Sequence, residues 1–261
     1  MLSIAAMLYY ELEQLDVKTA FLHGDLEEEL YMSRPEGFMK KGAEQQVCLL
    51  KKSLYGLKQS PRQWYKKFDE FMMQQGFQRS KFDSCVYFTA IKNKSLMYFL
   101  IYVDDMLIAS NDKSEIDALK RQLNKRFSMK DLGVASRILG IDIKRDRSNK
   151  ELVLSLQHCL EKVLKGFGML ESKAVTTPIG AHFKLQSVRD EDANKEAEFM
   201  KDIPYASCVG SVMYSMVNTR PDLAYGIGLI SRIMSKPAKE HWQTTKWLLR
   251  YIRGTTDLKL V

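Results

Sequence analysis

Residues 95–110 read SLMYFLIYVDDMLIAS, a stretch that is typical of a β-hairpin. The residues before position 103 are mostly aromatic or branched aliphatic, and such residues favour strands. A second apolar run follows at 106–110, and the VDD between the two runs is typical of a turn. The sequence therefore predicts a hydrophobic hairpin with Asp104 and Asp105 at its tip.

The paired carboxylates of Asp104 and Asp105 predict a cation site. Adjacent like charges at the tip of an apolar hairpin are unfavourable unless a cation compensates them, and Mg²⁺ prefers carboxylate oxygens. Successive side chains of an extended strand point in opposite directions, so we expect a third carboxylate from elsewhere. The alternative is a solvated turn, in which Asp is common.

Asp16 is the candidate for this third carboxylate. It lies in YYELEQLDVKT, residues 9–19, which predict a short strand. Two acidic sites carried by strands suit a metal pair that holds the attacking and leaving oxygens of a phosphoryl transfer. The alternative is an Asp on an edge strand that faces water.

Helical patterns lie on both sides of the hairpin. A helix is expected from Pro61 to Gly76, with Trp64 and Phe68 on its apolar face. A second helix is expected from Asp112, with either Ser114 or Asp112 as its cap. Further along the chain we expect two strands and four helices, in the ranges 135–145, 150–156, 157–167, 205–219, 222–234 and 238–251. The charged run at 187–202 predicts a linker over residues 181–204, between domains at 1–180 and 205–261.

Charge and cysteine content indicate which partners and which kinds of site to expect. The formal net charge of +8 at pH 7 favours a polyanionic partner such as nucleic acid. The four cysteines are widely spaced with no CxxC pair, so we expect neither a structural zinc site nor a disulfide framework. We expect no secretion signal and no membrane partner, and hence an intracellular protein of the cytoplasm or nucleus.

Several segments together resemble the reverse transcriptase region of copia-type (Pseudoviridae) LTR-retrotransposon polyproteins. They occur in the family's order and read LDVKTAFLHGDLEEELYMSRPEGF (15–38), SLYGLKQSPRQWY (53–65), YVDDMLIAS (102–110), FSMKDLGVASRILGIDI (127–143) and SVMYSMVNTRPDLAYGIG (211–228). The resemblance implies an α+β fold, with a right-hand polymerase palm and part of the fingers in residues 1–180. It also implies a helical thumb and connection region that leads toward an RNase H domain. The chain is expected to be truncated at both ends relative to the family.

The resemblance implies a role for each of several residues. Asp16, Asp104 and Asp105 match the catalytic aspartates, which hold two Mg²⁺ ions. Because successive side chains point in different directions, Asp105 is expected to be the more peripheral ligand. Lys130 matches a lysine near the leaving pyrophosphate, and Phe21 an aromatic residue beneath the incoming sugar. Their alternatives are a surface lysine and an ordinary core phenylalanine. Gln59 is implied in nucleotide binding, and template or primer contact is implied for Lys58, Arg62, Leu139 and Gly140.

The implied activity is RNA-directed DNA polymerisation, by transfer of a nucleotide to a primer 3′-hydroxyl. The implied partners are an RNA or DNA template with its primer and deoxynucleoside triphosphates. The first alternative is a catalytically inactive, nucleic-acid-binding remnant of a transposon polyprotein. A second alternative is a metal-dependent nuclease, because paired carboxylates also serve hydrolysis.

Overall fold

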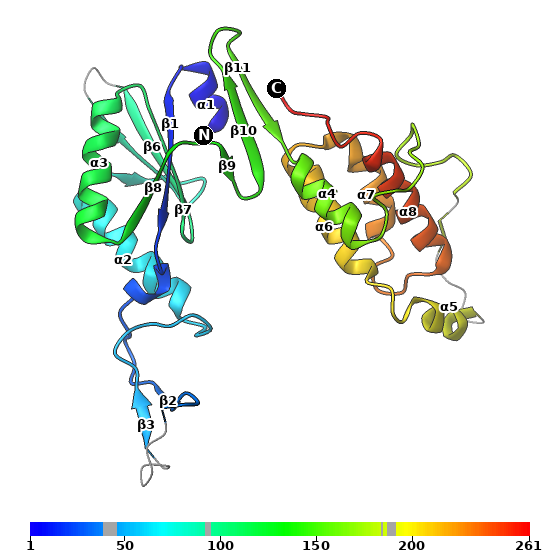
Figure 1. Ribbon diagram of the computed structural model, residues 1–261, viewed down its shortest axis with the longest axis horizontal. Helices are drawn as coiled ribbons and strands as arrows, with labels where there is room; N and C mark the ends of the chain where they lie inside the picture. The colour runs from blue at the N-terminus through cyan, green and yellow to red at the C-terminus, as the bar shows by residue number, and fades with distance from the viewer. Residues whose placement is uncertain (39–45, 92–94, 184, 187–191) are drawn as a thin grey trace. The chain divides into compact units, whose positions relative to one another are not determined.

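The computed structural model describes residues 1–38, 46–91, 95–183, 185–186 and 192–261. The chain divides into two compact units, Met1–Ala135 and Ser136–Val261 (Figure 1). Each unit has its own cluster of buried apolar side chains. The predicted mixture of helices and strands is confirmed, and each unit is described by itself below.

The first unit, Met1–Ala135, is built on an antiparallel six-stranded sheet. Its order is β4 (Gln78–Arg79), β5 (Val86–Ala90), β6 (Leu96–Tyr102), β7 (Asp105–Ser110), β1 (Glu11–Val17) and β8 (Met129–Val134). The hairpin predicted at 95–110 is the β6–β7 pair, and the strand predicted within 9–19 is β1. Both predictions are confirmed, and they place the two acidic segments on neighbouring strands.

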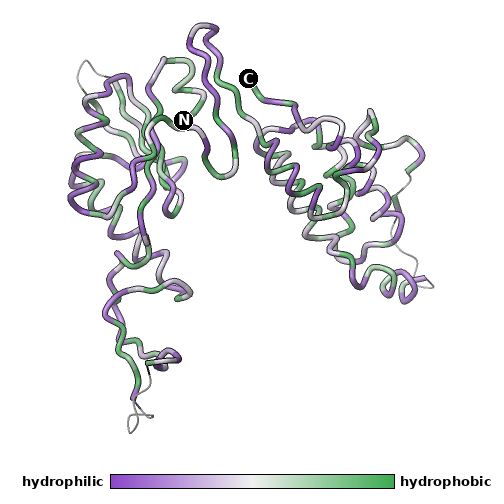
Figure 2. The backbone as a smooth tube through the Cα atoms, viewed as in Figure 1, coloured by the Kyte–Doolittle hydropathy of each residue, from purple (hydrophilic) through white to green (hydrophobic). Residues whose placement is uncertain are grey.

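Two helices cover one face of this sheet. The buried side chains of α2 (Ser60–Gln74) and α3 (Lys113–Arg126) share one core with alternate residues of the strands, such as Leu15 and Ile108. Asp112 caps α3, since its carboxylate accepts a hydrogen bond of 2.8 Å from the Ser114 backbone N–H. Hydrophobic and hydrophilic residues alternate along α3 in Figure 2, as a half-buried helix requires.

Smaller elements complete the first unit. They are α1 (Leu2–Met7), the 3₁₀ helix η1 (Ala20–His23), β2 (Tyr31–Ser33) and β3 (Val47–Leu49). Strands β2 and β3 pair with each other in a two-stranded sheet, away from the six-stranded one. Strand β2 lies between irregular segments, and positions 39–45 lie outside the described residues.

The second unit, Ser136–Val261, begins with a three-stranded sheet and continues as helices. The sheet order is β11 (Glu151–Ser155), β10 (Ile141–Asp146) and β9 (Arg137–Ile138). The helical part comprises α4 (Gln157–Gly166), α5 (Ala193–Met200), α6 (Tyr205–Asn218), η4 (Pro221–Leu223), α7 (Ala224–Ser231) and α8 (Lys239–Arg253). The helix predicted at 222–234 is shorter, because η4 supplies its first turn and α7 ends at Ser231.

The boundary between the units differs from the predicted linker at 181–204. The chain divides after Ala135, because α4 buries Leu160 and Leu164 in the same cluster as α6 and α8. Part of the charged run forms α5, whose Met200 joins that cluster. Apolar packing therefore assigns α4 to the C-terminal unit, which the charge pattern alone did not reveal.

An aromatic and a basic side chain of α8 form hydrogen bonds to the backbone of the irregular segment that follows α4. Trp247 donates to the carbonyl oxygen of Thr177 at 3.0 Å, and Arg250 donates to that of Lys173 at 2.6 Å.

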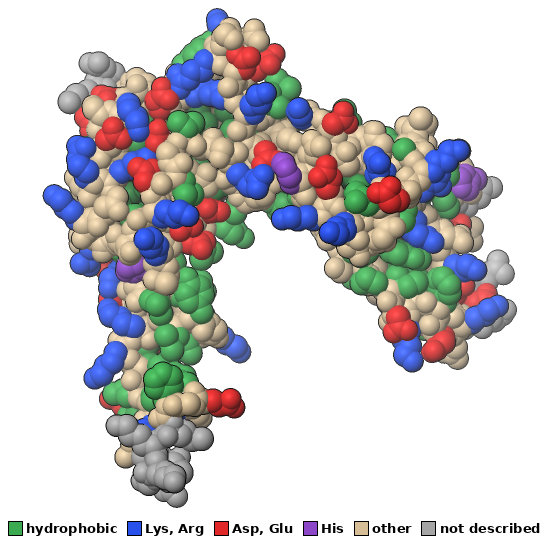
Figure 3. All heavy atoms as spheres, viewed as in Figure 1, with side chains coloured by type: hydrophobic (Ala, Val, Ile, Leu, Met, Phe, Trp, Pro, Cys, Tyr) green, Lys and Arg blue, Asp and Glu red, His purple; other side chains and the backbone are tan. Residues whose placement is uncertain are grey.

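The space-filling view in Figure 3 shows Lys and Arg side chains spread over the visible face of each unit. In the parts of the chain that are described, no helix is both long and apolar enough to cross a membrane.

Candidate active site

The turn of the β6–β7 hairpin contains two residues, Val103 and Asp104. Tyr102 ends β6 and pairs in register with Asp105, which begins β7. Val103 has a φ of +59°, in the left-handed region that a β-branched residue rarely adopts. The hairpin therefore reverses at Val103 and Asp104, through a strained turn, and Asp105 is the first residue of β7.

Asp16 on β1 lies directly opposite Asp105 on β7. The antiparallel register pairs these two residues, and paired residues on adjacent strands have Cα atoms about 4.5–5.5 Å apart and side chains on the same face. The backbone N–H of Val17 donates to the carbonyl oxygen of Asp104 at 3.1 Å. Asp16 and the Asp104–Asp105 pair, which are far apart in sequence, thus come together at one end of two neighbouring strands.

Asp16 and Asp105 lie on the sheet face opposite the helices. Leu15 and Val17 point into the core beneath α2 and α3, so Asp16 between them points away from it. All three aspartates are half-buried rather than enclosed. A ligand on this face could reach them without passing through the core.

Two polar neighbours act on the carboxylates. The buried Gln14 donates its side-chain N–H to a carboxylate oxygen of Asp105 at 3.5 Å. Lys130 on β8 is the register partner of Asp16 on the other side of β1. Lys130 therefore places a positive charge on the strand next to Asp16.

The donor set suits a hard divalent cation. Asp16, Asp104 and Asp105 offer carboxylate oxygens, which Mg²⁺ prefers, and Mg²⁺ usually takes its other ligands from water and substrate phosphates. Within the described ranges, no group of three His, Cys, Asp or Glu side chains is close enough together to hold a metal ion. Each bound ion would therefore take one or two of the three carboxylates, with non-protein oxygens as its other ligands.

Phe21 lies near the Val103–Asp104 turn of the β6–β7 hairpin. It belongs to η1, and its ring packs against that of Tyr55 with centroids 4.6 Å apart. Phe21, Trp64, Tyr102 and Val103 line part of one apolar pocket of about 270 Å³. Phe21, the residue expected beneath an incoming sugar, therefore lines a pocket next to the Val103–Asp104 turn, which is called the acidic turn below.

The remaining candidates fall into two groups. Gln59 is the N-cap residue of α2, and Lys58 and Arg62 on either side of it are exposed. Leu139 and Gly140 form the turn between β9 and β10 in the second unit, with φ values of +50° and +79°. The first group shares a unit with the three aspartates, and the second belongs to the other unit.

Trp64 contacts the hairpin turn, and this contact could not be predicted from the sequence. Its spacing on α2 predicted an apolar core residue, and the ring is indeed buried, but its indole N–H donates to the carbonyl oxygen of Val103 at 2.6 Å. A buried indole N–H usually finds a partner, which is the only hint that the sequence offers. The identity of that partner depends on the tertiary structure.

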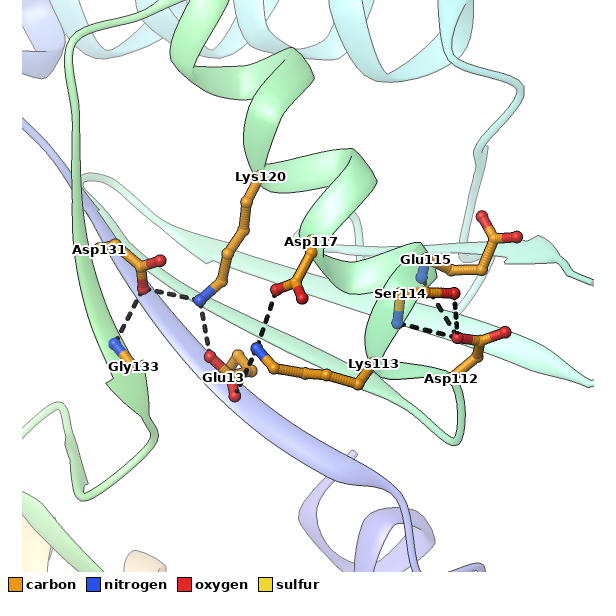
Figure 4. Close-up of polar contacts among 9 residues, drawn as sticks. All are labelled: Glu13, Asp112, Lys113, Ser114, Glu115, Asp117, Lys120, Asp131 and Gly133. Carbon is orange, nitrogen blue, oxygen red and sulfur yellow. Dashed lines mark hydrogen bonds and ion pairs between the residues drawn. The ribbon is translucent and has the colours of Figure 1, made fainter.

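A buried ion network supports the opposite face of β1 (Figure 4). Lys120 of α3 donates to the carboxylates of Glu13 and Asp131 at 2.6 Å each. Burial raises the pKa of Asp131, but hydrogen bonds from Lys120 and the Gly133 backbone N–H bring the net pKa below its ordinary value. The network ties together β1, β8 and α3, the elements next to Asp16 and Lys130.

Comparison with known proteins identifies the family. The family model for reverse transcriptase (RNA-dependent DNA polymerase) matches residues 1–181. The chain belongs to this family. This reverse transcriptase chain is 52% identical over 255 residues to the retrovirus-related Pol polyprotein from transposon TNT 1-94 of Nicotiana tabacum, an alignment that covers 98% of the chain and 19% of the polyprotein.

Other relatives agree with a copia-type retrotransposon origin. The reverse transcriptase chain is 37% identical over 256 residues to the Pol polyprotein from transposon RE1 of Arabidopsis thaliana, which covers 98% of the chain and 17% of that protein. It is 32% identical over 247 residues to the putative transposon Ty5-1 protein of Saccharomyces cerevisiae, with coverages of 94% and 77%. The chain thus spans under a fifth of the two plant polyproteins. No solved structure matches it.

Proposed function

We propose that this reverse transcriptase chain carries the nucleotidyl-transfer site of an RNA-directed DNA polymerase. The observation that supports this most is the register of β1 and β7, in which Asp16 lies opposite Asp105 beside the Asp104 turn. Such an acidic pair on an accessible sheet face suits a site for a divalent cation and a triphosphate. The family assignment favours polymerisation over hydrolysis at such a site.

Each residue has a part in the proposed reaction. Asp16, Asp104 and Asp105 would hold Mg²⁺, which when bound stabilises charge on the attacking and leaving oxygens of phosphoryl transfer. Lys130 would neutralise or protonate the departing pyrophosphate. Phe21 would exclude a ribonucleotide 2′-hydroxyl. Gln59 would contact the nucleotide.

The proposal extends to the parts of a right-hand polymerase. The six-stranded sheet with α2 and α3 would be the palm, and the β2–β3 hairpin would be part of the fingers. The second unit would supply the thumb and connection region, with Leu139 and Gly140 against the primer. Lys58 and Arg62 would contact the template or primer phosphates.

Primer extension tests the proposed function. The purified chain is incubated with a labelled DNA primer annealed to an RNA template, the four deoxynucleoside triphosphates and Mg²⁺. We expect a longer primer, no extension after chelation of the metal, and no extension by the Asp16→Asn variant. Binding of the primer–template without extension would instead support the inactive remnant, and shortening of the primer would support a nuclease.

A further inference from the structure

The acidic turn is held in a conformation that its own sequence disfavours. Val103 is β-branched and has a φ of +59°, a combination that costs free energy and persists only where its surroundings impose it. The adjoining Asp104 is bonded through its carbonyl oxygen to the Val17 N–H of β1. That bond restrains the Asp104 side of the turn.

Trp64 provides a second restraint from the helix side. Its indole N–H donates to the carbonyl oxygen of Val103 at 2.6 Å. The ring is 2% exposed and packs against Phe127 and Phe68, with centroids 5.2 Å and 5.5 Å away, so the donor has little freedom to move. A fixed donor sets the orientation of the peptide group that joins Val103 to Asp104.

We propose that Trp64 is a positioning residue for the catalytic aspartates. Its hydrogen bond keeps Val103 in the left-handed conformation, and this conformation sets the direction in which Asp104 leaves the turn. Trp64 touches neither substrate nor metal in this proposal and acts only through the Val103 carbonyl. The inference rests on the proposed function, because positioning matters only where the aspartates take part in chemistry.

A double-mutant cycle between Trp64 and Val103 separates positioning from general packing. Trp64→Phe keeps an aromatic ring in the core and removes the indole N–H, whereas Val103→Gly removes the strain because Gly adopts positive φ freely. We expect Trp64→Phe to lower kcat of primer extension about tenfold, the size of one hydrogen bond to a group in the site, with KM for the nucleotide little changed. In the Val103→Gly background the same substitution should lower kcat much less.

Trp247→Phe is the matched control. Trp247 also donates its indole N–H to a backbone carbonyl, that of Thr177 at 3.0 Å, but in the second unit. Its replacement removes the same chemical group away from the acidic turn. We expect kcat of Trp247→Phe to equal that of the parent chain.

Amide hydrogen exchange tests the inference without reference to activity. The Val17 N–H, which donates to Asp104, should exchange faster in Trp64→Phe than in the parent, while amides of the distant strand β5 should not change. An unchanged rate at Val17 would overturn the inference, as would an equal loss of kcat in both Val103 backgrounds. Faster exchange throughout the sheet would also overturn it, since Trp64 would then serve only the core. A parent chain that extends no primer refutes the proposed function. The exchange rates then decide only whether Trp64 holds the turn in place.

Discussion

Lys130 lies directly opposite Asp16, on the strand that flanks β1 on the side away from β7. A cation and two carboxylates therefore follow one another across three neighbouring strands, because Asp105 is the partner of Asp16 on the other side. In a pair of adjacent β-strands, residues in register share a face of the sheet. The lysine that the family resemblance associates with pyrophosphate is thus on the same face as the acidic pair.

The first prediction concerns this lysine. Lys130→Ala should lower the rate of primer extension by about 100-fold, the lower range for loss of a proton-transferring group. Lys130→Arg keeps the charge but holds its proton too firmly to donate it, so it should recover only part of the rate. Lys125→Ala, an exposed position at the end of α3, is the control. Full activity of Lys130→Ala would remove Lys130 from the site.

A second prediction ranks the carboxylates. Asp16→Asn and Asp104→Asn should abolish Mg²⁺-dependent extension, whereas Asp105→Asn should retain more activity. The reason is that Asp105 already accepts a hydrogen bond from Gln14, at 3.5 Å, and so has a protein partner for one carboxylate oxygen. The rates of the three variants, measured against Mg²⁺ concentration, decide the order. An active Asp104→Asn variant would contradict the metal-binding assignment, and equal losses would contradict only the ranking.

Selection against ribonucleotides is the third prediction. Phe21→Ala should raise the efficiency of ribonucleotide incorporation relative to deoxynucleotide incorporation by at least about tenfold, because removal of the ring opens space near the turn. Phe82→Ala is a suitable control, since the Phe82 side chain is fully exposed. The ratio of kcat/KM for the two nucleotides is the measurement. An unchanged ratio would place Phe21 outside the sugar site.

The buried ion network yields a prediction about stability. Lys120→Met should lower the free energy of unfolding by about 3 kcal/mol, because it leaves the buried Glu13 carboxylate without its closest cation. Lys113→Met is the matched control: Lys113 also pairs with Glu13, at 3.0 Å, but its side chain is half exposed. Its loss should cost less than about 1 kcal/mol. Urea unfolding followed by circular dichroism compares the two, and equal effects would contradict the prediction.

His23 should make stability depend on pH. Burial lowers the pKa of His23 below 6.5, and the nearby Lys67 and Lys52 also lower it, although a hydrogen bond to the backbone of Lys18 opposes them. The unfolded chain then binds a proton more readily than the folded one, so stability is complete above pH 6.5 and declines as the pH falls below it. Burial lowers the pKa of His241 in the second unit as well.

The test compares urea midpoints between pH 7.5 and 5.5 for the parent chain and His23→Phe. Phenylalanine suits the site because His23 already packs against Trp64 and Phe127, with centroids 5.7 Å and 5.5 Å away. The variant should lose less stability than the parent over this range, and the remainder should reflect His241. Identical pH profiles would show that His23 does not contribute.

Most of the secondary structure could be predicted from local patterns. The hairpin at 95–110, the strand within 9–19 and a cap at Asp112 or Ser114 follow from strand propensity, alternation and side-chain hydrogen bonding over a few residues, and the structure shows that the cap is Asp112. The domain boundary could not be predicted in this way, because it depends on which core receives Leu160 and Leu164. A charged run indicates exposure, and exposure alone does not mark the end of a compact unit.

The sequence by itself determined which residues are acidic, where the hairpin turns and to which family the chain is similar. The tertiary structure alone decided that Asp16 faces Asp105 and Lys130, and that Trp64 donates to Val103. Strand propensity and periodicity act within a few residues of chain, so their effects can be predicted from the sequence. Strand register and buried hydrogen bonds join residues tens of positions apart, and they are chosen by the packing of the whole sheet against its helices.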